Sequence, residues 1–117
     1  MRDYRKLLAF NLADKLVIKV YEATTDFPKN EVFGLTAQIR RAAVSVPSNI
    51  VEGCARSSEK DYVRFLEIAF GSLHELKYQM SLANRLGYLE KKKWDEINSD
   101  CEETAKVLTG IIKSISS

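Results

Sequence analysis

Lysine and arginine residues gather at three places in this chain, and ionic contact with phosphate groups is the chemistry that such clusters can perform. In an antiparallel helical bundle the first two clusters would lie at the same end, where they would bind RNA with an affinity that falls steeply as salt rises. The alternative is an ordinary solvated helix end, in which these charges mix with Asp3, Glu59 and Asp61. The three basic clusters are Arg2, Arg5 and Lys6; Arg56, Lys60 and Arg64; and Lys91, Lys92 and Lys93.

Four further charged residues lie beside apolar helix stripes: Arg40, Arg41, Glu52 and Glu75. An arginine guanidinium can bind a carboxylate through two parallel hydrogen bonds. We therefore expect Arg40 or Arg41 to pair with a glutamate, Glu75 or Glu52, across the second and third helices, in preference to an RNA contact. Such pairing would make all four residues structural.

Patterns typical of catalysis or metal binding are missing from the sequence. A di-metal helical bundle needs Glu-x-x-His pairs, but the only histidine, His74, has Gly71 three residues before it. A histidine next to Glu75 on a helix is more typical of a surface or interface than of a proton shuttle. No glycine-rich phosphate loop or nucleophile elbow is present. We therefore expect no catalytic residue, no metal and no cofactor.

Length and composition favour one domain over residues 1–117, because a chain with 45% hydrophobic residues can bury a core without disulfides or metals. The formal net charge of +2 neither demands nor excludes an anionic partner. Cys54 and Cys101 belong to no CxxC pair, so we expect reduced, packed thiols. No apolar run approaches the roughly 20 residues that cross a bilayer, and the first residues lack the apolar core of a secretory signal. A cytoplasmic protein without a membrane partner is expected.

Residues 4–24 contain no glycine or proline and predict the first helix. Their apolar residues form two overlapping stripes, whereas a helix that packs only on its own core shows one. The extra stripe indicates burial against another subunit. Asp26 and Pro28 mark the break that follows. The stripes are Phe10, Ala13, Val17, Val20 and Thr24, and Leu8, Leu12 and Leu16.

The second helix is expected from residue 29 or 30 to residue 51 or 53, with a kink near Pro47, because proline removes a backbone donor and crowds the preceding turn. Ser45, Ser48 and Asn49 flank the proline and can bond the backbone groups that it leaves unpaired. Gly53 is expected to cap the helix in the left-handed conformation. The apolar stripe of this helix is Ile39, Ala42, Ala43, Val46, Ile50 and Val51.

The third helix is expected to begin after residue 57 or 58 and to end at residue 85 or 86, before Gly87. Gly71, in its middle, costs about 1 kcal/mol relative to alanine, which indicates that a neighbouring backbone, that of the Pro47 bend, comes close. Residues 90–93 open the fourth helix. The stripes expected in the core are Tyr62, Phe65, Ala69, Leu73, Leu76, Met80 and Ala83, and Trp94, Ile97, Cys101, Thr104, Leu108, Ile111 and Ile115.

These four helices predict an all-α, up-and-down antiparallel four-helix bundle, because short connections force consecutive helices to run antiparallel. At about 1.5 Å per residue, helices of roughly 20 to 30 residues form a rod about 30 to 45 Å long. No strand is needed.

The segments QIRRAAVSVPSNIVEG, GSLHEL and LGYL resemble a family of small bacterial four-helix-bundle proteins first noticed inside intervening sequences of large-subunit ribosomal RNA genes. This resemblance, which covers nearly the whole chain, implies a bundle that assembles into a ring of five subunits. It also implies kinship with the accessory variability proteins of diversity-generating retroelements, which are more basic and bind nucleic acid and a reverse transcriptase. The matching positions are Gln38, Arg41, Ala42, Ser45, Pro47, Asn49, Ile50, Glu52, Gly53, Gly71, Ser72, Glu75 and Leu76.

Two hypotheses about function follow. The first is a non-enzymatic, ring-forming helical protein that binds structured RNA through the first two basic clusters, without reading base sequence. The alternative is a protein-interaction scaffold or accessory subunit that binds no nucleic acid. Neutralising these clusters separates the hypotheses, since only RNA binding should fail. In both, the residues expected to be structural or to hold subunits together are Arg40, Arg41, Pro47, Asn49, Glu52, Gly53, Gly71 and Glu75.

Overall fold

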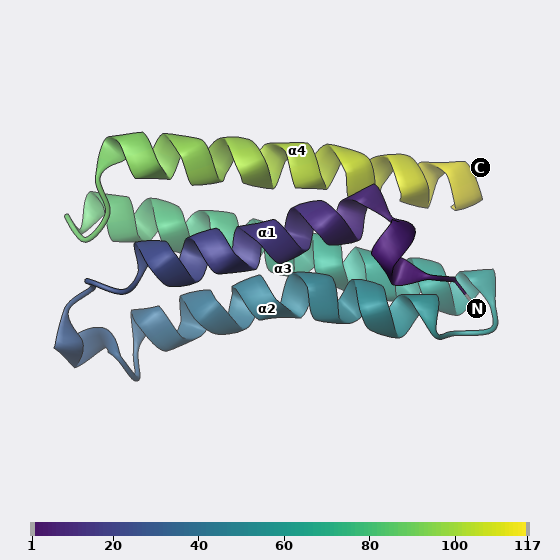
Figure 1. Cartoon of the computed structure of the whole chain (residues 1–117), viewed down its shortest axis with the longest axis horizontal. Coiled ribbons are helices and arrows are strands. Elements are labelled where there is room, and N and C mark those ends of the chain that lie inside the picture. Colours follow the sequence, from purple (N-terminus) through teal and green to yellow (C-terminus); the bar gives the residue numbers. More distant parts are fainter. Residues whose placement is uncertain (1, 117) are drawn as a thin grey trace.

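The computed structural model describes residues 2–116 and contains four long helices, two short 3-10 turns and, within that range, no strand. It measures 43 × 24 × 19 Å, and consecutive long helices run in opposite directions (Figure 1). The predicted all-α, up-and-down antiparallel four-helix bundle is therefore confirmed. The elements are η1 (Tyr4–Lys6), α1 (Leu8–Ala23), η2 (Lys29–Glu31), α2 (Leu35–Cys54), α3 (Glu59–Arg85) and α4 (Lys91–Ser116).

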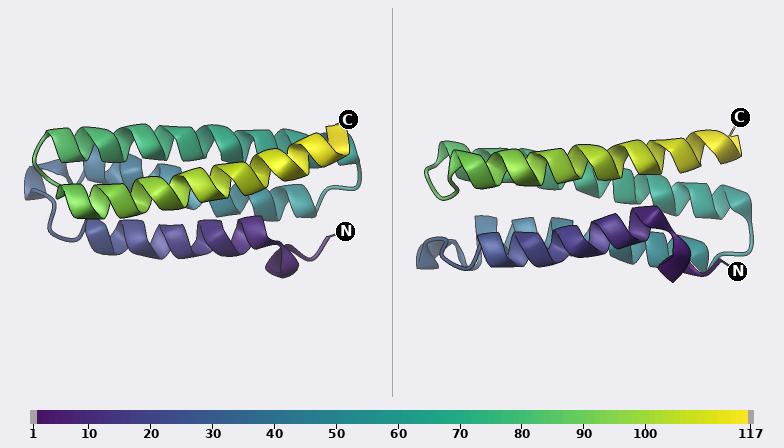
Figure 2. Two further views of the ribbon diagram at one scale, coloured as in Figure 1. Left: turned by 90° about the horizontal axis from the view of Figure 1, so that it is seen from above. Right: turned by 45° about the horizontal axis from the view of Figure 1, so that its top comes forward.

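Each long helix packs against two others: α2 lies between α1 and α3, and α4 contacts both α3 and α1. Figure 2 shows that the N-terminal and C-terminal segments lie at the same end of the bundle. The N-terminal segment is attached to the end of α2, because the backbone N–H of Arg2 donates to the carbonyl of Cys54 at 3.1 Å. The first two basic clusters therefore share one end, as predicted, and we call it the basic end.

The core stripes of α3 and α4 agree with the periodicity of the sequence. All seven residues predicted for the α3 stripe are buried. In α4 the middle of the stripe, from Ile97 to Leu108, is buried, and its two ends are partly buried. In α1 the buried stripe is Ala9, Ala13, Leu16 and Val20, which matches neither predicted stripe as a whole, and Leu8 is 60% exposed. Apolar side chains of α1 thus remain on the outer surface, and their burial against another subunit stays a prediction.

The first two helices begin later than predicted, because acidic side chains form local caps. Asp3 accepts a hydrogen bond from the backbone N–H of Arg5, which closes the η1 turn, and Leu7 is extended before α1 begins. The predicted start of α2 at residue 29 or 30 is wrong as well, since residues 29–31 form η2 instead. The Glu31 carboxylate then accepts from the backbone N–H of Leu35 at 3.1 Å, so that α2 begins there.

Two predictions about glycines are wrong. Gly53 is not a left-handed cap: it lies inside α2, and the one positive-φ glycine within residues 2–116 is Gly87, at φ 84°. A Cβ atom on Gly53 would lie 3.0 Å from the Cβ of Phe65, so this glycine lets α3 approach α2. No atom lies within 4 Å of a Cβ built on Gly71, so no neighbouring backbone of the chain comes close there.

Pro47 lies inside one continuous helix and does not divide it. The side-chain amide of Asn49 donates to the carbonyl of Ser45 at 2.8 Å, and the hydroxyl oxygens of Ser45 and Ser72 are 2.8 Å apart. The first bond lies within α2, and the second joins α2 to α3 next to the proline. Neither involves the carbonyl of Ala43, which the proline leaves without a donor. The kink itself stays a prediction.

Candidate nucleic-acid interface

The basic end is built from the N-terminal segment, the end of α2 and the first two turns of α3. A short link turns the chain between the two helices, and the hydroxyl of Ser58 caps α3 by accepting from the backbone N–H of Asp61 at 3.1 Å. Lys60 and Arg64 are four residues apart and therefore lie on the same face of α3. This architecture places positive side chains from three segments around the start of α3.

Three of the predicted basic residues, Arg2, Arg56 and Arg64, lie over aromatic rings, and we call them the arginine cluster. The guanidinium carbon of Arg2 lies 3.8 Å from the ring centre of Tyr62. Those of Arg56 and Arg64 each lie 4.7 Å from the ring centre of Phe65. Both rings are buried, so they form a fixed support. Stacking restrains the guanidinium and leaves its N–H edge free to donate.

Of the other predicted residues of the basic end, Arg5 is paired with a carboxylate, whereas Lys6 and Lys60 are not. Arg5 donates two hydrogen bonds to the carboxylate of Asp3, at 3.0 and 3.2 Å. This bond lowers the pKa of Asp3 and raises that of Arg5, so the two charges offset each other. Lys6 and Lys60 are exposed and form no ion pair with any described residue. Arg64 also lies 3.9 Å from the Asp61 carboxylate, an ion pair that partly offsets its charge. Arg2, Arg56 and these two lysines therefore supply most of the available positive charge.

The third basic cluster, at the opposite end, is largely paired. Lys91 bonds Asp95 at 2.9 Å, and Lys93 bonds Glu96 at 3.2 Å. Glu96 also accepts from Lys19 of α1, and its pKa is lowered by the hydrogen bond from Lys93 first and that from Lys19 second. These pairs leave little free positive charge for phosphate at this end.

The predicted pairing of Arg40 or Arg41 with a glutamate of α2 or α3 does not occur within the chain. Arg40 lies on the side of α2 that faces α1, so its guanidinium donates to the Thr24 hydroxyl at 2.9 Å and to the Tyr21 carbonyl at 3.3 Å. It therefore fixes α1 to α2. Arg41 is exposed, and so are both predicted glutamate partners, Glu52 and Glu75; residues 2–116 hold no ion pair for any of the three.

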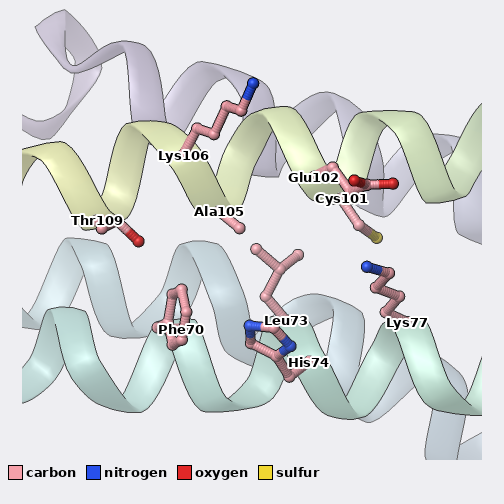
Figure 3. A pocket seen from close by; sticks show the side chains of 9 residues that line it. All are labelled: Phe70, Leu73, His74, Lys77, Cys101, Glu102, Ala105, Lys106 and Thr109. Carbon is pink, nitrogen blue, oxygen red and sulfur yellow. The ribbon is translucent and has the colours of Figure 1, made fainter.

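A hollow of about 370 Å³ lies between α3 and α4 and contains the only histidine of the chain. Figure 3 shows Leu73 pointing from α3 toward Ala105 of α4, with Phe70 and His74 beside it. The His74 ring stands edge-on to Phe70, with ring centres 4.5 Å apart. Burial raises the pKa of Cys101 to about 12, so this thiol is protonated and a poor nucleophile near neutral pH. The hollow therefore has no reactive thiol and is mainly an apolar surface between α3 and α4.

Metal centres and membrane-spanning helices need patterns that residues 2–116 do not contain. This range holds no group of three or more histidine, cysteine, aspartate or glutamate residues able to bind a metal ion. None of its helices has both the length and the apolarity that crossing a membrane requires.

Comparison with known proteins supplies a family and a fold. The model of the family described as 23S rRNA-intervening sequence protein matches residues 5–110. A similar solved structure is the crystal structure of a protein with unknown function from the S23 ribosomal protein family of Bacteroides thetaiotaomicron VPI-5482. The two chains are 26% identical, with a TM-score of 0.82, over 91% of this chain and 99% of that one. No curated protein matches. Neither description names an enzymatic activity.

Proposed function

The chain belongs to the 23S rRNA-intervening sequence protein family, and from this premise we propose that it is a non-enzymatic, ring-forming protein that binds structured RNA electrostatically. The ring has five subunits, as the resemblance implies. One observation carries the proposal: the guanidinium groups of Arg56 and Arg64 both stack on the buried ring of Phe65.

An arginine held in this way is well suited to bind phosphate. Its planar fork of N–H donors matches two phosphate oxygens, and stacking reduces the side-chain entropy that binding would otherwise cost. Two such arginines on one ring place two forks close together, with Lys60 one turn before Arg64 on α3. RNA presents phosphates in rows, so neighbouring cations bind a backbone without reading the bases.

Ring assembly would multiply this interface. Each basic end also carries acidic residues, among them Asp3, Glu59 and Asp61, so one copy alone attracts RNA weakly. Several copies in one ring present several arginine clusters to the same RNA. Once one cluster has bound, the next binds at a high effective concentration, and the overall affinity exceeds that of a single site.

Charge reversal in the arginine cluster tests the proposal. The double variant Arg56→Glu, Arg64→Glu is expected to bind a fluorescently labelled stem-loop RNA about 100-fold more weakly at low salt, because it bonds fewer phosphates and releases fewer counterions. Fluorescence anisotropy measures the affinity. The matched control is Lys29→Glu, Lys92→Glu, which makes the same change in net charge at exposed residues of the opposite end.

The control variant is expected to lose less than about fivefold in affinity, since only long-range attraction changes. Equal losses in the two variants would show that net charge alone governs binding and would contradict a defined interface. Absence of binding by the wild-type protein even at low salt would contradict the RNA proposal and favour a protein partner. Circular dichroism melting curves check that both variants fold.

A protein-interaction scaffold is the second candidate, and one feature favours it. Phe33 is 97% exposed, and Val32 beside it is 50% exposed. The turn that carries them is fixed, because the Glu31 carboxylate accepts from the Leu35 backbone and, at 3.0 Å, from the Tyr88 hydroxyl. Adjacent apolar side chains held in solvent on a fixed turn are typical of a protein-binding surface. The variant Phe33→Ser is expected to leave RNA affinity unchanged.

A further inference from the structure

We infer that one face of α3 in each copy of the chain packs into a groove between α1 and α2 of the next copy, with Glu75 pairing Arg41 across the contact. This inference rests on the proposed ring and names the surfaces that form it. The occupant of the groove is a second copy of this chain. The α3 outer face consists of Ile68, Gly71, Glu75 and Tyr78.

The α3 outer face has the spacing of a helix seam, but no other helix within residues 2–116 covers it. Its Tyr78 ring is approached by Arg85 of the same helix, whose guanidinium carbon lies 5.9 Å from the ring centre. The four residues of the face follow steps of three, four and three, which places them on one side of the helix. Ile68 is 42% exposed and Tyr78 is 60% exposed. Between them, a Cβ atom on Gly71 would meet nothing within 4 Å. Bare backbone flanked by two apolar side chains lets another chain approach closely.

The α1–α2 groove consists of two adjoining hollows, of about 480 and 580 Å³, that share Val44. Along α2 its lining extends from Ala37 to Glu52, which is about 22 Å at a rise of 1.5 Å per residue. By the same measure Ile68 and Tyr78 are about 15 Å apart, so both fit along the groove. The apolar and aromatic side chains that line the hollows are Phe10, Val17, Tyr21, Ala37, Val44, Pro47 and Val51.

Charge complementarity places Glu75 at the Arg41 hollow of the groove, because the other hollow is lined by the carboxylates Asp14 and Glu52. Arg41 is exposed at the groove and has no carboxylate partner among residues 2–116, whereas its neighbour Arg40 is already bonded to α1. Glu75 is likewise exposed without a cationic partner in that range, and it lies between the apolar residues of the α3 outer face. Opposite charges on matching apolar surfaces fix the register of a contact and disfavour wrong partners.

The symmetry of this contact agrees with a ring. The α3 outer face and the groove are different patches of one chain, so each copy offers both and the association is head to tail. Contacts of this type close into rings when the rotation between copies allows it. A two-fold dimer, in contrast, requires one patch that fits itself.

Exchange of the two charges tests the inference without RNA. The single variants Arg41→Glu and Glu75→Arg are expected to dissociate at protein concentrations at which the wild type stays assembled, because each brings two like charges together. The double variant Arg41→Glu, Glu75→Arg is expected to recover the wild-type mass. Native mass spectrometry and light scattering after gel filtration measure these masses. The matched control variants are Lys92→Glu and Glu103→Arg, exposed charges of α4 that are expected to change nothing.

The outcomes separate this interface from the ring itself. If the wild type is assembled but both single variants keep its mass, or if the double variant fails to recover it, the interface is wrong while the ring stands. A monomeric wild type overturns both. The variant Tyr78→Ala tests the same interface without any change in charge. It removes a ring that packs in the groove, so it should also lower the assembled fraction.

Discussion

Replacement of Gly53 by valine is expected to lower the free energy of unfolding by about 2 to 3 kcal/mol, the upper part of the range of about 1 to 3 kcal/mol that overpacking of a well-packed core costs. The reason is the closeness of α2 and α3 at this residue. A Cβ atom there would lie 3.0 Å from the Cβ of Phe65, 3.2 Å from a ring carbon of Tyr62 and 3.4 Å from the Tyr62 carbonyl oxygen. These atoms lie on or next to the α3 backbone, so only movement of the helix relieves the overlap.

The matched control is the variant Gly110→Val. Gly110 is also inside a helix, but no atom beyond its own helical turn lies within 4 Å of a Cβ built on it. Valine and glycine differ by only about 0.4 kcal/mol in intrinsic helix propensity, so this variant should unfold close to the wild type. Urea unfolding at one fixed protein concentration measures both, because assembly makes stability depend on concentration. Equal stability of the two variants would contradict the close approach of α2 and α3.

The variant Leu66→Ala is expected to destabilise the bundle by about 3 kcal/mol, because it buries less apolar surface and leaves a cavity. Leu66 is fully buried in α3, with 0% of its surface exposed. The same substitution at Leu8, which is 60% exposed in α1, should cost less than about 0.5 kcal/mol. Thermal melting followed by circular dichroism compares them. A loss of stability at Leu8 as large as that at Leu66 would show that an assembly interface outside the α1–α2 groove buries α1.

The stripes of α3 and α4 could be predicted because each repeats the helical period over more than five turns. Over that length, periodicity outweighs any single unfavourable residue, including Gly71 and Gly110. The same pattern predicted the bundle and the shared end of the first two basic clusters. Both the bundle and the shared end follow from the up-and-down direction of consecutive helices alone.

Helix starts and side-chain partners could not be predicted in the same way, because they depend on local bonds and on helix orientation. One carboxylate, that of Glu31, decides where α2 begins. The role of Gly53 depends on how closely α3 packs against α2, which the residues next to this glycine do not specify. Arg40 bonds α1 because of the side of α2 on which it lies.

The aromatic support of the arginine cluster also escaped prediction. Tyr62 and Phe65 were expected only in the core, and they are buried there, yet arginines from three segments lie over their rings. A signal was present in the sequence, since Arg64 stands directly before Phe65. It could not be interpreted without knowing that the start of α3 meets the N-terminal segment and the end of α2.

The salt dependence of RNA binding tests the central claim most directly. Anisotropy titrations of a labelled stem-loop RNA give the association constant of the wild type and of the neutral variant Arg56→Gln, Arg64→Gln at several salt concentrations. The wild type is expected to bind saturably with a steep negative slope of log affinity against log salt, and removal of each phosphate-binding cation should reduce that slope by about 1. An unchanged slope in this variant, or a wild type whose affinity does not depend on salt, would contradict an interface built on the arginine cluster.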